Sequence, residues 1–95
     1  MANDIFQQMF VQLVVQNQQI AMIAMGKILN PVTNKVEKNL EYAKVSIDTL
    51  DMLAEKTKGN LTDMEKNFLD EAIKEVKLNY VAEIEKNKSE LPKDK

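Results

Sequence analysis

Residues 5–26 contain no charged side chain, and this stretch constrains the fold more than any other part of the sequence. It is long enough to span a bilayer as a helix. However, the stretch contains seven amide side chains: Gln7, Gln8, Gln12, Gln16, Asn17, Gln18 and Gln19. The last four of these are consecutive in the sequence. Amide groups without partners are costly in lipid. We therefore expect a helix of a soluble protein and no integral membrane segment.

The apolar residues of this helix lie on two opposite sides. We expect one side to pack in the core of the chain, and it carries Phe6, Met9, Phe10, Leu13, Ile20, Ala21 and Ala24. The second side carries Val11, Val15 and Met22, with Gln18 and Met25 beside them. A small chain covers one such face well, so we expect the second face to contact another copy. The alternative is a central helix that buries both faces inside one chain.

Breaks between helices are few, because the sequence has two Pro and two Gly. We expect an all-α fold with three long helices at about residues 4–28, 39–57 and 62–87. They form a single helical domain over residues 1–88, a bundle completed by oligomerisation, followed by a disordered polar tail at 89–95. Asn39 is the predicted N-cap of the second helix, and Thr62 and Glu65 form a predicted capping box.

The other two helices have clear apolar faces. The core face expected for the second helix consists of Leu40, Ala43, Ile47, Leu50 and Ala54, and that of the third of Phe68, Leu69, Ala72, Ile73, Val76, Tyr80 and Ile84. Val45 and Met52 lie on the far side of the second helix. The predicted interface between copies therefore comprises Val11, Val15, Gln18, Met22, Val45 and Met52.

The sequence lacks several of the side chains that enzymes most often use in catalysis. The sequence has no His, Cys or Trp, and all 13 of its basic residues are Lys, so Arg is absent too. The usual general base, nucleophilic thiol and bidentate phosphate clamp are therefore missing. The formal net charge of −2 argues against a nucleic-acid partner. We expect no enzymatic activity and no cofactor.

Two clusters remain as weak candidates for a site. Asp48, Asp51 and Glu55 share an acidic edge of the second helix, where clustered carboxylates favour a divalent cation or, alternatively, solvent or ion pairs across an interface. The second cluster is the loop after that helix, with Lys56, Lys58, Gly59, Asn60, Thr62 and Glu65. It is either a tight helix–helix connection or an anion site at a helix N-terminus.

This loop also carries a family resemblance. Residues 47–53 (IDTLDML) and 56–62 (KTKGNLT) resemble the signature of a small bacterial family, domain of unknown function eighteen forty-four. Further matching positions extend over about residues 20–81. Asn34 and Asn39 stand where we expect Gly and Asp, and residues 76–78 replace a segment that usually carries Arg. The resemblance implies a short, all-helical cytosolic protein and implies no activity.

These observations favour a non-enzymatic homo-oligomeric helical protein of the bacterial cytoplasm, acting as an adaptor or assembly component with a protein partner. No amino-terminal pattern of a signal peptide is present. The alternative function is a small ligand- or divalent-ion-binding regulator. A third hypothesis is a peripheral membrane or partner-helix binder, which the absence of Lys from residues 5–26 disfavours for anionic lipid.

Overall fold

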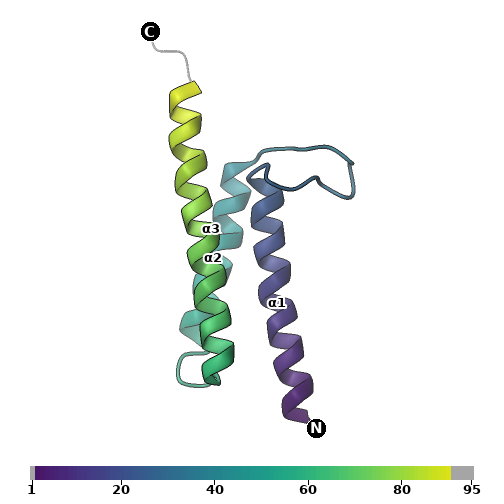
Figure 1. The fold of residues 1–95 in the computed structure, drawn as a ribbon, viewed down its shortest axis with the longest axis vertical. Helices are drawn as coiled ribbons and strands as arrows, with labels where there is room; N and C mark the ends of the chain where they lie inside the picture. The colour runs from purple at the N-terminus through teal and green to yellow at the C-terminus, as the bar shows by residue number, and fades with distance from the viewer. Residues whose placement is uncertain (1, 91–95) are drawn as a thin grey trace.

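The computed structural model describes residues 2–90 and contains three helices. Helix α1 spans Ala2–Ala24, α2 spans Leu40–Lys56 and α3 spans Asp63–Glu90. The chain runs up, down and up again, so α2 is antiparallel to both α1 and α3 (Figure 1). The described residues form no regular strand, and the predicted all-α fold is confirmed. Each helix contacts the other two in a thin bundle, 59 × 28 × 16 Å across.

The helix ends follow local signals in the sequence. Helix α1 ends at Ala24, earlier than the expected end near residue 28, because Gly26 adopts a left-handed φ of 79°. The side chain of Asn39 accepts a hydrogen bond from the Tyr42 amide, which confirms the predicted N-cap of α2. At the start of α3, the Thr62 amide donates to Glu65 and the Glu65 amide donates to the Thr62 hydroxyl. This exchange is the predicted capping box.

The C-terminal end of α3 lies beyond the predicted one. Residues 89–90, expected to begin the polar tail, are the last residues of α3, and residues 91–95 of that tail lie outside the described part of the chain. Between residues 2 and 90, no helix has the length and apolar content needed to cross a membrane.

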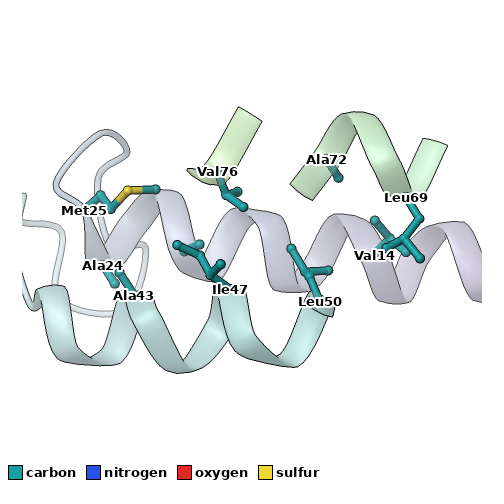
Figure 2. Close-up of a cluster of buried hydrophobic side chains, with 10 residues drawn as sticks. Val14, Ala24, Met25, Ala43, Ile47, Leu50, Leu69, Ala72 and Val76 are labelled. Carbon is teal, nitrogen blue, oxygen red and sulfur yellow. The ribbon is translucent and has the colours of Figure 1, made fainter. Parts of the chain in front are cut away.

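The core lies along the axis of the bundle, where all three helices meet. Figure 2 shows Val14 of α1 close to Leu69 of α3, and Ala24 of α1 against Ala43 of α2. Short side chains at the α1–α2 contact allow the two helices to approach closely. The fully or nearly fully buried apolar residues are Val14, Ala21, Ala24, Met25, Ala43, Ile47, Leu50, Leu69, Ala72 and Val76.

The core face of α1 differs from the predicted one. Phe6, Met9 and Leu13 were expected in the core, but 65%, 60% and 41% of their respective surfaces remain exposed, so that prediction is wrong. Ala21 and Ala24 of the expected core side are buried, and the inward face also includes Val14, which belongs to neither apolar side recognised in the sequence. A helix with apolar residues on several sides does not specify by periodicity alone which side turns inward. The buried faces expected for α2 and α3 are confirmed at their central positions.

Substitution of Leu50 by Ala is expected to lower the free energy of unfolding by about 2–5 kcal/mol, because the surrounding helices cannot fill the resulting cavity. Leu78 is the matched control: it lies exposed on α3, and Leu78→Ala should change the free energy of unfolding by less than about 0.5 kcal/mol. Urea unfolding followed by circular dichroism measures both variants. Equal losses would contradict the assignment of Leu50 to the core.

Candidate functional site

The most distinctive surface of the molecule is an apolar stripe on the outside of α1. It consists of positions separated alternately by three and four residues, which we call the outer stripe: Phe6, Met9, Leu13, Gln16, Ile20 and Ile23. This spacing is that of a coiled-coil seam. The first half of the stripe is largely exposed, whereas Ile20 and Ile23 are partly covered. An exposed stripe with seam spacing has the form of a surface that packs against another helix.

Amide side chains flank the outer stripe. Gln12 and Gln19 lie on one flank, and both are exposed. A solvent-facing helix normally carries charged residues on its outer side, but α1 has none after Asp4. Large exposed apolar areas on a folded chain indicate an interaction surface. The absence of charge means that such an interaction depends on apolar contact and hydrogen bonds from amides.

Helix α2 has an outer ridge of its own. Tyr42, Val45, Thr49 and Met52 follow the same alternation of three and four residues on the side opposite the core. Tyr42, Val45 and Met52 are about half exposed. Val45 and Met52 were predicted interface residues, and the structure places both on this accessible ridge. Their contact with another copy stays a prediction.

A cavity joins the outer stripe to the outer ridge. Its volume is about 440 Å³, and it opens between the end of α1, the start of α2 and the connection between them. Ile20 and Ile23 contribute from α1, Tyr42 from α2, and Pro31 and Val32 from the connection. Asn30, Glu37 and Asn39 add polar groups to this mainly apolar lining.

The connection between α1 and α2, residues 25–39, is folded back on itself as in a hairpin. Antiparallel bridges pair Met25 with Lys38 and Asn30 with Lys35. Its base is closed by a hydrogen bond of 2.7 Å from the Asn39 amide to the Ala24 carbonyl. Its tip contains Asn34, whose φ of 60° is the left-handed conformation expected for this turn residue. This ordered connection projects from the bundle beside the end of α1 (Figure 1).

Glu83 of α3 ties this connection to the bundle. Its side chain is only 4% exposed, and its carboxylate forms ion pairs of 2.7 Å with Lys27 and 2.8 Å with Lys38. The hydrogen bonds from Lys27 and then Lys38 lower the pKa of Glu83 to about 2. Lys27 lies near the start of the connection and Lys38 lies near its end. One carboxylate therefore binds both of the segments that run side by side in the connection. We call this arrangement the Glu83 clamp.

Sequence reasoning missed the Glu83 clamp, although a signal was present. Glu83 follows Leu69 and Val76 at intervals of seven residues, so it continues the buried side of α3. A carboxylate at such a position requires a cationic partner. The partners lie in the connection, whose path the helical pattern alone does not specify.

The predicted interface on the second side of α1 is partly occupied inside the chain. Met22 packs against the core, and the Gln18 side chain donates a hydrogen bond to the Glu75 carboxylate on α3. Val11 and Val15 are half-buried. This side of α1 therefore faces α3 at Gln18, and the role of Val11 and Val15 in contacts between copies stays a prediction.

The acidic edge is distributed among ion pairs. Asp48 lies 3.0 Å from the Lys44 ammonium, and Asp51 lies 3.1 Å from that of Lys77 on α3. Glu55 is exposed one turn further along α2. Within residues 2–90, no three acidic side chains converge in a geometry that could hold a metal ion. The carboxylates therefore serve the surface ion pairs seen here.

The loop after α2 is organised by hydrogen bonds within the backbone and the capping box. The Asn60 amide donates to the Thr57 carbonyl at 2.8 Å, and Gly59 adopts a φ of 79°. At the start of α3, the side chains of Thr62 and Glu65 each accept a hydrogen bond from the backbone amide of the other residue. Lys56 and Lys58 are exposed. These contacts fit a tight helix–helix connection, and anion binding here stays an untested alternative.

Comparison with known proteins gives one family match. The model of a family described as "Domain of unknown function (DUF1844)" matches residues 7–83, which confirms the resemblance seen in the sequence. No curated protein and no solved structure matches the chain.

Replacement of Glu83 by Gln tests the clamp. At neutral pH we expect the variant to lose about 1–3 kcal/mol of unfolding free energy, the contribution of hydrogen bonds between charged groups. The folded pKa of about 2 lies below the ordinary value of 4.5, so this contribution is complete above pH 4.5 and is lost as the pH falls towards 2. The difference between wild type and variant should therefore shrink over that range.

Urea unfolding at a series of pH values measures this difference. Glu85→Gln is the control, because Glu85 is an exposed residue of the same helix and the substitution removes the same charge. It should have little effect on the free energy of unfolding. A Glu83→Gln difference that is independent of pH would contradict the assigned ion pairs.

Divalent cations test the acidic edge. Millimolar Ca²⁺ or Mg²⁺ is expected to leave the melting temperature unchanged beyond the effect of ionic strength, because Asp48 and Asp51 already have lysine partners. Thermal unfolding with sodium chloride of matched ionic strength is the measurement. A rise in melting temperature that Asp51→Ala with Glu55→Ala abolishes would contradict this expectation and support the ion-binding alternative.

Proposed function

The chain belongs to the DUF1844 family, whose description assigns no activity, and we propose that it is a non-enzymatic helical module that self-associates. In this proposal it acts as an adaptor or assembly component in the bacterial cytoplasm. The observation that carries the proposal is the outer stripe of α1, whose Phe6, Met9 and Leu13 remain exposed on a helix without charges after Asp4.

The energetics favour contact over exposure for this stripe. Complete burial of a Phe, Met or Leu side chain contributes about 1.5–3 kcal/mol. Association itself costs about 4–15 kcal/mol in lost translational and rotational freedom. Several such side chains from each copy are therefore needed, and the outer stripe together with the outer ridge of α2 provides them.

A second copy of the chain suits this surface because the surface is uncharged. Two identical charged surfaces repel each other, whereas two copies of the outer stripe bring only apolar side chains and amides together. Gln12 and Gln19 on its flank carry both donors and acceptors, so the glutamines of two copies can hydrogen-bond to one another. Asp4 is the one charged side chain of α1, and the outer stripe itself contains none.

The substitution Met9→Glu tests the proposal. A carboxylate at the centre of a buried contact lacks a partner, so we expect the variant to shift from an oligomer towards a monomer while its helix content remains. Size-exclusion chromatography with light scattering gives the mass, and circular dichroism gives the helix content. The control is Gln8→Glu, one residue earlier, on a different side of α1 and also exposed, which should keep the wild-type mass.

Two outcomes would contradict the proposal. If wild-type protein is monomeric at micromolar concentration, the outer stripe is not a contact between copies. If Met9→Glu and Gln8→Glu dissociate the oligomer equally, the added charge causes the dissociation wherever it stands on α1, and the outer stripe is not the contact. Val15→Glu extends the test to the other predicted interface: dissociation by this variant alone would move the contact to the side of Val11 and Val15.

A further inference from the structure

The outer stripe has a different shape at each of its ends, and this difference carries an inference about how two copies pair. Near the N-terminus of α1, Phe6 and Met9 protrude, with about three-fifths of each side chain exposed. Near the C-terminus, Ile20 and Ile23 form one wall of the cavity that the connection and Tyr42 complete. The outer stripe therefore has projecting side chains at one end and a hollow at the other.

We propose that two copies pair through antiparallel α1 helices, with Phe6 of each copy seated in the cavity of the other. The proposal rests on the self-association proposed above and specifies its partner surface and register. The cavity is large enough for this occupant, because an apolar cavity of about 150 Å³ already holds a benzene ring and this one measures about 440 Å³. The apolar part of its lining, which includes Ile20, Ile23 and Tyr42, suits an aromatic side chain, while Asn30, Glu37 and Asn39 form the polar part.

A single antiparallel register aligns the whole seam. If Phe6 lies opposite Ile23 of the partner subunit, then Met9 lies opposite Ile20 of the partner subunit. The same register places Leu13 opposite Gln16 of the partner subunit. The stripe contains two kinds of position, those that begin a step of three residues and those that end one. In each pair, a position of one kind faces a position of the other kind, and the side chains interdigitate as in a coiled coil.

A parallel arrangement fits these surfaces less well. It places Phe6 against its own equivalent, so two bulky rings meet at one end of the outer stripe. It also leaves the cavity beside Ile23 without an occupant and aligns the two helix dipoles in the same direction. The antiparallel arrangement avoids all of these costs.

The absence of cysteine from the chain permits a direct test by disulfide formation. The proposed register brings Gln12 close to Gln19 of the partner subunit, on the exposed flank of the seam and outside its apolar positions. Gln12→Cys and Gln19→Cys are therefore made separately, one of them with a size tag, then mixed and mildly oxidised. A disulfide forms only when the two Cα atoms come within about 7 Å.

The expected result is a disulfide between Gln12→Cys and Gln19→Cys chains in the mixture, at least 10-fold more abundant than the product that either variant forms with itself. Gln8→Cys mixed with Gln19→Cys is the control and should form less product, because residue 8 lies one turn before residue 12 on the same flank but farther round α1 from the outer stripe. Light scattering of the reduced proteins gives the oligomeric mass in the same samples.

The remaining outcomes separate the two proposals. A disulfide of each variant with itself, in place of the mixed product, would show a parallel arrangement and overturn the inference while self-association stands. An oligomeric mass without any of these disulfides would overturn the register alone. A monomeric mass for the reduced wild-type chain would overturn both the register and the proposed function.

Discussion

Packing of α1 against the α2–α3 pair is the interaction on which the rest of the structure depends. It places Val14 and Ala21 in the core and brings Ala24 against Ala43, which fixes how α1 is rotated about its own axis. Within residues 2–90, no further helix covers α1 from outside. The rotation that buries Val14 therefore leaves Phe6, Met9 and Leu13 in solvent, and the exposed stripe is a direct consequence of the core.

The Glu83 clamp links this core to the surface. Its carboxylate lies on the buried side of α3, yet it binds Lys27 and Lys38 of the connection that follows α1. With both of its segments held, the connection stands beside Ile20, Ile23 and Tyr42 and completes the cavity. The same buried group thus stabilises the fold and holds the connection that shapes the hollow end of the outer stripe.

Much of the fold could be predicted from the sequence, because the signals for it are local. Asn39, Thr62 and Glu65 act through neighbours within three residues, and the buried side of α3 follows from simple periodicity. The inward side of α1 could not be predicted in this way, because apolar residues occur on several of its sides and only the shape of α2 and α3 selects among them. The Glu83 clamp could not be predicted from local patterns either. Lys27 and Lys38 are far from Glu83 in the sequence, and only the hairpin-like path of residues 25–39 brings these lysines to the Glu83 carboxylate.

The central claim is that α1 packs on two sides, one inside its own chain and one against a second copy. Sedimentation equilibrium of the unmodified protein over a range of concentrations tests it most directly. We expect a mass of about twice the 10.9 kDa of the chain at micromolar concentration, falling towards the chain mass only on strong dilution. A mass that stays at 10.9 kDa up to the highest soluble concentration would contradict it.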